Sequence, residues 1–452
     1  MKSINPATEE TIREHGEHDA GEVRHRLERA AAAAASWRDF SFAERAELMS
    51  RAAELLREKC SAYGRLIAEE MGKPIAAAES EVDKCAWVCD FYAEHAASFL
   101  APEAVATDAS RSFVRYDPLG PVLAIMPWNF PFWQHFRFAA PAVMAGNVAL
   151  LKHASNVAGC ALAIEDLFRQ AGFPEGVMTA LLVPSSRIAE LIAAPEVRAV
   201  TLTGSERAGT EVAAEAGRRL KKTVLELGGS DPFIVLDDAD PVAAAGQAAK
   251  ARTVNSGQSC IAAKRFLVAE PIAERFEEEL VQRMEALVVG DPMDRETEIG
   301  PMAREDLLAT LDDQVSRTVA AGALLATGGR RLPRKGWFYA PTVLTGVAPG
   351  MAAFDEETFG PVAAVTRTRD TAEAIALANR SPFGLGASIW TADPMRAEDL
   401  AREIDSGSVF VNGIVKSDPR LPFGGVKSSG YGRELAAVGI REFVNIKTVW
   451  IK

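Results

Sequence analysis

A cysteine and a glutamate in small, glycine-rich settings are the residues of this chain best suited to chemistry. Cys260 follows a Gly-Gln-Ser run, and Glu226 lies two positions before a Gly-Gly pair. A thiolate is a strong nucleophile, and a carboxylate can act as a general base on water. A free cysteine most often packs in a core, but Cys260 has small polar neighbours before it. The pair therefore predicts covalent catalysis through a thiol.

Two further segments place polar groups where predicted strands end. Asn129 comes just after an apolar strand at 122–126, where its amide could donate to a developing oxyanion. A turn asparagine before a proline is the alternative. Thr203-Gly204-Ser205 follows a strand and opens a helix, whose first amides suit a pyrophosphate. This turn departs from the G-x-G-x-x-G pattern, so a simple capped turn is an equal alternative.

Alternating strands and helices must position these residues. Apolar strands are predicted at 122–126, 148–151, 177–183, 199–203 and 223–227, with helices between them, and a second alternating series begins after Asp231. This α/β pattern predicts doubly wound parallel sheets with ligand at the carboxyl ends of the strands. The two series meet between Glu226 and Cys260, so the site is predicted in a cleft between two domains.

The regions outside this alternation carry their own signals. Ser41 and Glu44 form a capping-box pattern, and Gly72 supplies a stop, which together predict one helix from 41 to 72. The polar stretch 107–116 predicts a projecting strand or hairpin, with a surface loop as the alternative. The apolar tail at 443–451 predicts a strand. Since exposed strand edges are rare, this strand is expected to pair with another subunit.

Composition argues against several classes of function. The chain has 452 residues and a net charge of −12, which disfavours nucleic-acid and anionic-membrane partners. Five cysteines without a C-x-x-C pair indicate reduced thiols. Cys85 and Cys89 share a helix face and are expected to pack, not to bind metal. No apolar run approaches the roughly 20 residues of a membrane span. We therefore expect a cytoplasmic protein with no metal.

Seven motifs, in order, resemble those of the aldehyde dehydrogenase superfamily: 127–131 (PWNFP), 150–152 (LLK), 203–205 (TGS), 226–229 (ELGG), 258–260 (QSC), 356–361 (EETFGP) and 422–425 (PFGG). The resemblance covers nearly the whole chain. It implies a Rossmann-like dinucleotide-binding domain at 1–102 and 119–228. It also implies an α/β catalytic domain at 229–428 and a small β oligomerisation extension at 103–118 and 443–452.

The resemblance also implies roles for individual residues. Cys260 resembles the nucleophile, Asn129 the oxyanion donor beside the Cys260 backbone N–H, and Glu226 the base that activates water. The implied cofactor residues are Trp128, Lys152, Ser155, Gly204, Ser205, Glu357 and Phe359. Among them, Lys152 and Glu357 resemble ribose-binding residues. Ser205 resembles a pyrophosphate contact, and Phe359 a wall beside the nicotinamide.

The segment 128–155 is similar to that of bacterial succinate-semialdehyde dehydrogenases. Trp133 and Arg137 are four positions apart on one helix, and Arg137 with Ser417 could clamp a terminal carboxylate of the substrate. A surface arginine and a turn serine are the alternative. The implied substrate is succinate semialdehyde. Glutarate semialdehyde or broad specificity stays open, because one methylene separates substrates by only about 1–3 kcal/mol.

Ser155 bears on the choice of cofactor. NAD-preferring relatives usually carry an acidic residue three positions after the lysine that matches Lys152, and this chain has Ser155 there. A carboxylate would bind the ribose 2′-hydroxyl and repel a 2′-phosphate. We therefore expect that NADP is accepted and preferred over NAD.

Two other roles are less favoured. A CoA-acylating enzyme would not need a water-activating base such as Glu226. A structural protein on the same fold would not need Cys260, Glu226 and Asn129 together. The expected partners are a small aldehyde and further copies of the chain, in a homodimer or homotetramer.

Overall fold

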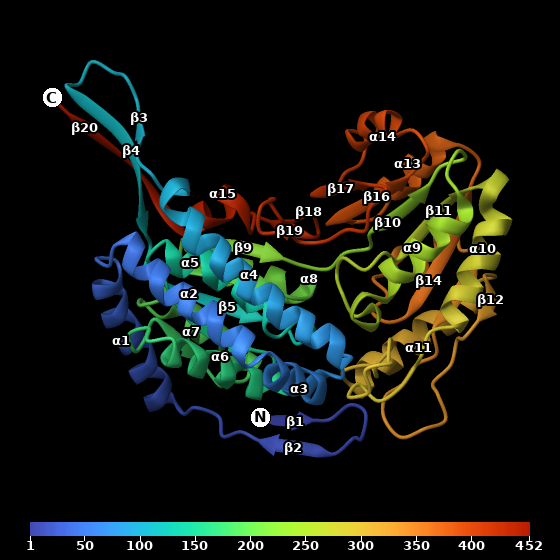
Figure 1. Ribbon diagram of the computed structural model, residues 1–452, viewed down its shortest axis with the longest axis horizontal. Helices are drawn as coiled ribbons and strands as arrows, with labels where there is room; N and C mark the ends of the chain where they lie inside the picture. Colours follow the sequence, from blue (N-terminus) through green and yellow to red (C-terminus); the bar gives the residue numbers. More distant parts are fainter.

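The computed structural model describes residues 1–452, which form two α/β units and a narrow β arm (Figure 1). The first unit holds a six-stranded sheet in the order β19-β9-β8-β5-β6-β7, and the second a seven-stranded sheet in the order β12-β13-β14-β11-β10-β16-β17. The arm is a three-stranded sheet that projects from the first unit and ends at the C-terminus. The predicted α/β class with a small β extension is confirmed.

In the first sheet, the strands of the predicted alternation are parallel, and β19 alone runs antiparallel. These strands are β5 (Pro121–Met126), β6 (Val148–His153), β7 (Met178–Ala180), β8 (Ala199–Thr203), β9 (Lys222–Glu226) and β19 (Gly430–Tyr431). Ile125 pairs with Lys152 and Thr203 with Glu226. The carboxyl ends of β6, β8 and β9 therefore lie along one edge of the sheet.

Four helices connect these strands, namely α5 (Trp133–Met144), α6 (Ala158–Gln170), α7 (Ile188–Ala193) and α8 (Glu206–Arg218). Four more precede the sheet, namely α1 (Ala20–Trp37), α2 (Phe42–Glu58), α3 (Cys60–Met71) and α4 (Ile75–Phe99). The helix predicted across 41–72 is thus two helices. The break at Lys59 lets α3 approach α4, where a Cβ on Gly64 would lie 2.9 Å from the Glu79 side chain. No helix has the length and hydropathy to cross a membrane.

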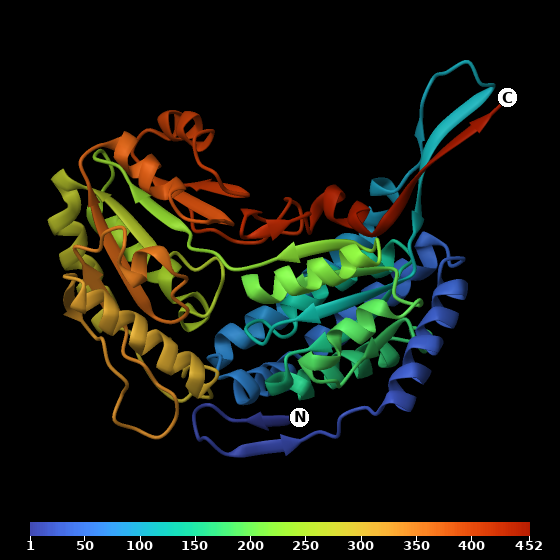
Figure 2. The same cartoon turned by 180° about the vertical axis from the view of Figure 1, so that it is seen from behind.

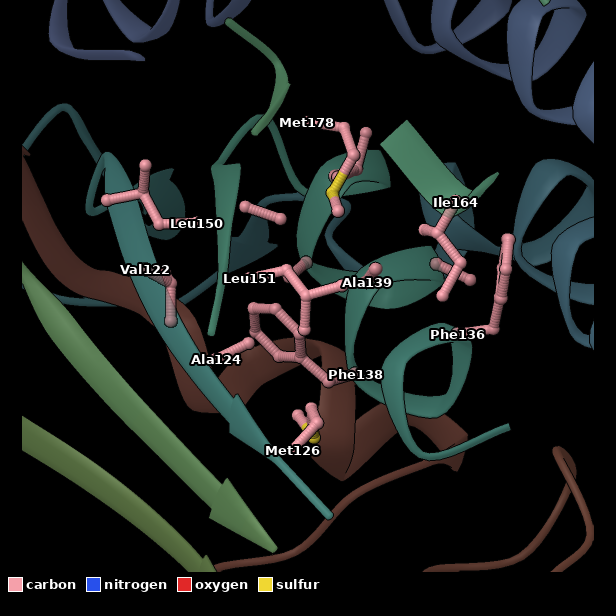
Figure 3. Packing of buried hydrophobic residues seen from close by; sticks show 14 of the residues in the cluster. Val122, Ala124, Met126, Phe136, Phe138, Ala139, Leu150, Leu151, Ile164 and Met178 are labelled. Atoms are coloured by element: carbon pink, nitrogen blue, oxygen red, sulfur yellow. The ribbon is translucent and has the colours of Figure 1, made fainter. Parts of the chain in front are cut away.

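The core of the first unit lies between its sheet and α5 and α6. Figure 3 shows Val122, Ala124 and Met126 of β5 in one apolar cluster with side chains of α5, β6 and β7. Phe136 of α5 stacks on Phe168 of α6 with ring centroids 5.7 Å apart. The same core contains Cys85 and Cys89, which are both fully buried, as expected of cysteines that pack in a core.

The second sheet is parallel except for β12 at its edge. Its strands are β10 (Pro232–Val235), β11 (Arg265–Ala269), β12 (Leu324–Thr327), β13 (Thr342–Thr345), β14 (Val362–Thr368), β16 (Gly386–Trp390) and β17 (Ser408–Val411). The helices of this unit are α9 (Pro241–Thr253), α10 (Glu270–Glu285), α11 (Glu305–Ala320), α12 (Ala352–Asp355), α13 (Thr371–Asn379) and α14 (Pro394–Ala401). A short pair, β15 (Phe383–Gly384) and β18 (Val426–Lys427), connects this unit to β19.

The arm consists of β3 (Glu103–Ala104), β4 (Arg111–Pro118) and β20 (Val444–Ile451), with α15 (Ala436–Ile440) before β20. The hairpin predicted at 107–116 is present as β3 and β4. The tail strand pairs along its whole length with β4 of its own chain. The resemblance groups 103–118 and 443–452 in one β extension, whereas the apolar tail alone suggests pairing with another subunit, for which only the other edge of β20 is left. At the opposite side of the first unit, β1 (Lys2–Ile4) and β2 (Thr11–Glu14) form a hairpin (Figure 2).

Candidate active site

The candidate nucleophile Cys260 follows three successive residues in the left-handed backbone region. Asn255, Ser256 and Gly257 have φ values of 55°, 56° and 76°. Such a run costs free energy at non-glycine positions and is a feature of functional sites. A Cβ on Gly257 would lie 2.1 Å from the carbonyl oxygen of Gly360. Only glycine fits there, so the loop before Cys260 packs directly on the segment after Glu357.

Lys264 binds the backbone of the loop that carries Cys260, and the sequence analysis made no prediction for it. Its ammonium donates to the carbonyl oxygens of Ser259 at 3.0 Å, Cys260 at 2.8 Å and Ala262 at 3.2 Å. The side chain is fully buried and lies 3.5 Å from a carboxylate oxygen of Glu357. The only signal in the sequence was a lysine at the start of a buried strand segment. Lys264 therefore joins the nucleophile loop to a predicted cofactor residue.

Burial governs the protonation of the thiol. It raises the pKa of Cys260 to about 12, and the cations of Arg137 and Lys264 oppose that rise. Burial therefore favours the neutral thiol in the free protein. Attack on a substrate requires that the proton leave at that moment.

Glu226 ends β9 with its carboxylate buried and without a hydrogen-bond partner for either oxygen. Burial raises its pKa to about 8, and Glu434 adds to the rise while Arg137 opposes it. A Cβ on Gly424 would lie 2.7 Å from Glu226 Oε1, so the glycine makes room for this carboxylate. A carboxyl group of this kind can exchange a proton near neutral pH.

Asn129 lies directly against the nucleophile loop. Its side-chain Nδ2 donates to the backbone carbonyl oxygen of Gln258 at 3.1 Å. The backbone carbonyl oxygen of Asn129 accepts from Asn255 Nδ2 at 2.7 Å. The side chain is 5% exposed. The structure therefore brings Asn129 beside Cys260 in space, although the two lie far apart in the sequence. Its role as oxyanion donor stays a prediction.

One cavity of about 1130 Å³ joins Cys260 to all three predicted substrate residues, Trp133, Arg137 and Ser417. None of the predicted cofactor residues lines it. Its charged lining comprises six cations (Lys73, Lys84, Arg137, Lys250, Arg283 and Lys416) and three carboxylates (Glu81, Asp240 and Glu298). Lys73, Arg137 and Arg283 form ion pairs with Glu81, Glu434 and Glu279, respectively. The other three cations, Lys84, Lys250 and Lys416, form no ion pair, and they make the cavity locally basic in a chain of net charge −12. It suits an anionic small molecule.

Arg137 has protein partners that the sequence analysis did not foresee. Its Nε forms an ion pair with Glu434, and both side chains are buried. Its Nη2 donates to Thr203 Oγ1 at 3.3 Å, and the guanidinium lies over the Phe423 ring at 4.6 Å. Two of the N–H groups that Arg137 would need for the predicted clamp with Ser417 therefore already have partners within the protein.

Lys84 is a second cavity residue that the sequence analysis missed. It extends from α4, donates to Ser417 Oγ at 2.9 Å and lies 4.2 Å from the ring centroid of Trp133. No periodicity or motif marked it, because α4 lies far from the motifs along the chain.

The predicted cofactor residues gather at the carboxyl ends of the first sheet. Lys152, at the end of β6, is buried with only Ser185 Oγ as a hydrogen-bond partner, at 3.4 Å. Ser155 lies just beyond it and is exposed. Ser205 caps α8, and Gly204 donates its N–H to the carbonyl oxygen of Glu226 at 2.9 Å. A buried cation without an acidic partner, at the same sheet edge as a helix N-terminus, fits the phosphates and hydroxyls of a dinucleotide.

The remaining cofactor residues adjoin the nucleophile loop. Glu357 Oε1 accepts the N–H of Gly229 at 2.9 Å. A Cβ on Gly228 would lie 2.6 Å from the other carboxylate oxygen, so the absence of a side chain at Gly228 leaves space for the carboxylate of Glu357. Trp128 and Phe359 meet edge to face with ring centroids 5.9 Å apart. Their roles toward a cofactor stay predictions.

Comparison with known proteins decides the family. The model of the aldehyde dehydrogenase family matches residues 1–449. The chain belongs to the aldehyde dehydrogenase family.

Relatives in this family match along their whole length. A protein of Synechocystis sp. described as "Probable succinate-semialdehyde dehydrogenase [NADP(+)]" is 53% identical over 451 residues, covering 100% of this chain and 99% of the relative. Succinate-semialdehyde dehydrogenase [NADP(+)] 1 of Mycobacterium tuberculosis is 50% identical over 454 residues, with the same coverage. The solved structure of succinic semialdehyde dehydrogenase from Streptococcus pyogenes in complex with NADP+ is 37% identical, with a TM-score of 0.97 over 100% of this chain and 99% of that one.

Membership of the aldehyde dehydrogenase family confirms the resemblance drawn from the seven motifs. It also confirms the fold implied by them, since structures of the family superpose on this one at TM-scores of 0.96 to 0.98. The motifs were sufficient because several of them place a glycine at a close approach that the fold requires. Gly228, Gly360 and Gly424 are three such positions.

Proposed function

We propose that this aldehyde dehydrogenase oxidises succinate semialdehyde to the acid with NADP. The observation that carries the proposal is the basic cavity, which connects Cys260 to Arg137 and Ser417. An aldehyde with a terminal carboxylate would place its anion among these cations and its carbonyl carbon at the thiol. The names of the two relatives above agree with this substrate and cofactor.

The reaction we propose begins at Cys260. The sulfur would form a bond to the aldehyde carbon while the thiol proton passes to a water molecule in the cavity, and the electron pair of the C=O π bond would move to the oxygen, which becomes an oxyanion. Asn129 and the backbone N–H of Cys260 would stabilise that oxyanion, and one such donor contributes about 2.7–4 kcal/mol. Bound NADP supplies the acceptor for the hydride, and a thioester on Cys260 results. Ionised Glu226 would then take a proton from a water molecule as the water oxygen bonds to the thioester carbon. The C–S bond breaks, the acid is released, and the proton on Glu226 returns to the Cys260 sulfur as the thiol re-forms.

The cofactor preference rests on Lys152 and Ser155. Lys152 keeps a cation at the end of β6, and burial lowers its pKa. Ser155 is exposed and uncharged, so no carboxylate at this position repels a 2′-phosphate. We propose that NADP is preferred and NAD is accepted.

Glutarate semialdehyde is a second candidate substrate. A cavity of about 1130 Å³ is larger than a four-carbon aldehyde requires. The extra methylene would fit within it, and broader specificity is compatible with the same volume.

We also propose a function for each part of the chain. Residues 1–102 and 119–228 would bind the dinucleotide, and residues 229–428 would supply the nucleophile. The arm at 103–118 and 443–452 would join subunits of a homodimer or homotetramer in the cytoplasm.

The deciding experiment is a kcat/KM panel with both cofactors. The substrates are succinate, glutarate and malonate semialdehydes and neutral aldehydes of matched length. The proposal expects the acidic four-carbon aldehyde with NADP to be the best substrate, and free acid to accumulate over many turnovers without CoA. A preference for neutral aldehydes would reject the substrate, and failure to form free acid without CoA would reject hydrolysis.

A further inference from the structure

Lys84 presents a cation to the substrate cavity with no carboxylate paired to it. The side chain is half-buried on α4, and its Nζ donates to Ser417 Oγ at 2.9 Å. The ammonium also lies 4.2 Å from the ring centroid of Trp133. An ammonium has three donor hydrogens, and only one of them is used in the hydrogen bond to Ser417, so donors remain for a further acceptor.

The carboxylates near Lys84 are engaged elsewhere. Glu81, one helical turn earlier on α4, forms a buried ion pair with Lys73. Asp418 accepts from Nε of Arg420 at 2.9 Å and from its Nη2 at 2.7 Å. A partly buried cation without an anionic partner is unfavourable in the free protein. A ligand carboxylate in the cavity would relieve that cost.

Arg137 alone is a weak candidate for binding that carboxylate. Its Nε is paired with Glu434, and its Nη2 donates to Thr203. A bidentate grip on a carboxylate needs two free N–H groups on one edge of the guanidinium. Lys84 has no such competing carboxylate, and it shares Ser417 with the predicted clamp.

We propose that Lys84 and Ser417 together bind the terminal carboxylate of the aldehyde, which makes Lys84 a specificity-determining residue of this enzyme. Ser417 accepts from Lys84 and keeps its own O–H to donate to the carboxylate. Arg137, held by Glu434, then shapes the cavity wall and its field. This inference rests on the proposed function, because it assigns the residue that selects the acidic substrate.

The acid–base behaviour of Lys84 gives a readout that a structural lysine lacks. Burial lowers the pKa of Lys84 to about 8, and the Arg137 cation on α5 contributes to that shift, while Cys85 and Glu81 on α4 and Asp418 after β17 oppose it. Below this value the ammonium is charged and can bind a carboxylate; above it the charge is lost. Selectivity for acidic aldehydes should therefore fall as the pH rises through 8.

The test compares succinate semialdehyde with butanal, a neutral aldehyde of the same carbon number, in three variants. Lys84→Met removes the charge, Lys84→Arg keeps it, and Lys335→Met removes an exposed lysine outside the cavity. We expect Lys84→Met to lower kcat/KM for succinate semialdehyde roughly 10- to 100-fold and to leave butanal oxidation nearly unchanged. Lys84→Arg should restore most of the loss, and Lys335→Met should behave as wild type.

The pH profile completes the test. For wild type, the ratio of kcat/KM for succinate semialdehyde to that for butanal should fall by up to roughly tenfold between pH 7 and pH 9. Taking the ratio cancels the titrations of Cys260 and Glu226, which act on both aldehydes. In Lys84→Arg the ratio should be flat over this range.

Failure of this inference differs from failure of the proposed function. If wild type prefers succinate semialdehyde but Lys84→Met changes both aldehydes equally, or neither, Lys84 does not select the substrate. If wild type prefers butanal, the proposed substrate itself is wrong.

Discussion

Burial favours the neutral form of both the Cys260 thiol and the Glu226 carboxyl. The pKa of Cys260 is raised to about 12 and that of Glu226 to about 8. Glu226 is therefore the group of the pair that can titrate within the working range of an enzyme. This favours its use in the hydrolytic step, where a proton must be taken from water. The positive charges of Arg137 and Lys264 assist ionisation of Cys260.

The first prediction concerns the pH dependence of hydrolysis. A base with a raised pKa is active above that value and inactive below it, so the deacylation rate should rise with pH to a plateau, with its midpoint near the Glu226 pKa of about 8. Glu226→Gln should abolish this rise of the deacylation rate with pH and lower kcat about 10²- to 10⁴-fold. A rapid burst of NADPH should survive, because attack and hydride transfer precede the step that needs Glu226. Stopped-flow absorbance measures both quantities.

A matched control is Glu211→Gln, an exposed carboxylate on α8. It should keep the profile of wild type. If Glu226→Gln retained the same rise near pH 8, another group would be the base.

The second prediction concerns Ser155 and the cofactor. Ser155→Glu places a carboxylate three residues after Lys152, where it would repel a 2′-phosphate. KM for NADP should rise roughly 10- to 100-fold through repulsion and a lost polar contact, and KM for NAD should fall. Ser155→Ala, which adds no charge, should change NADP affinity much less. Initial rates with each cofactor measure this, and unchanged NADP affinity in Ser155→Glu would remove Ser155 from the explanation.

At the scale of elements, the loop before Cys260 and the segment after Glu357 form one packed unit. Gly257 admits the carbonyl of Gly360, and Lys264 joins Glu357 to the carbonyl of Cys260. The position of the nucleophile thus depends on the segment that carries the predicted ribose and nicotinamide contacts. A shift of either element should disturb both attack and cofactor binding.

The third prediction follows from this packing. Gly257→Ala adds a Cβ that would lie 2.1 Å from a backbone oxygen, at a φ of +76° that disfavours alanine. The loop must move, and a displacement of about 1 Å can reduce rate roughly 10²-fold. We expect kcat/KM to fall by about that factor while the fold persists. Circular dichroism reports the fold, and NADPH formation reports the rate.

Gly217→Ala on α8 is the control, because an added Cβ would meet no atom within 4 Å and the φ at this position is ordinary. This variant should be as active as wild type and slightly more stable, by up to about 1 kcal/mol. Equal activity of Gly257→Ala and Gly217→Ala would show that the Gly257–Gly360 contact is not required.

The sequence predicted those elements whose signal is local. The strands of the first sheet and the capped start at Ser41 follow from apolar runs and a capping box. The break at Lys59 was not predictable, because it depends on how closely α3 approaches α4 at Gly64. For the same reason, the intrachain partner of β20 could not be read from the tail, since pairing with β4 depends on tertiary structure.

The candidate site divides in the same way. Cys260, Glu226 and Asn129 stood in motifs and were found. Lys84 and Lys264 were missed because a lysine in a helix or before a strand carries no distinctive pattern. Their importance arises only from what surrounds them, namely a cavity in one case and three carbonyl oxygens in the other.

At the scale of the whole molecule, both α/β units contribute to the site, and the arm extends away from it (Figures 1 and 2). Asn129 and Glu226 lie at the ends of strands of the first sheet, and Cys260 lies between β10 and β11 of the second. The arm contributes nothing to the cavity lining. Its role must lie elsewhere.

The arm has the surface expected of a subunit interface. On β20, Ile446 is 62% exposed and Trp450 is 47% exposed. Both side chains lie on the same face of the arm as Tyr116 of β4, which pairs with Ile446. A three-stranded ribbon exposed on both faces buries little apolar surface and leaves the outer edge of β20 unpaired. A second subunit would cover the face, the edge, or both.

The last prediction tests this interface directly. Replacing Ile446 and Trp450 together by lysine puts two like charges on the apolar face, and their burial against another subunit would be strongly unfavourable. We expect the proposed oligomer to dissociate into smaller species, measured by size-exclusion chromatography with light scattering. Asn445→Lys adds charge to the opposite face of the same strand and should leave assembly intact. A wild-type chain that runs as a monomer would refute the assignment, since the arm would then be stable while exposed. Because the cavity lining excludes the arm, a dissociated variant that stays folded should retain its preference for acidic aldehydes.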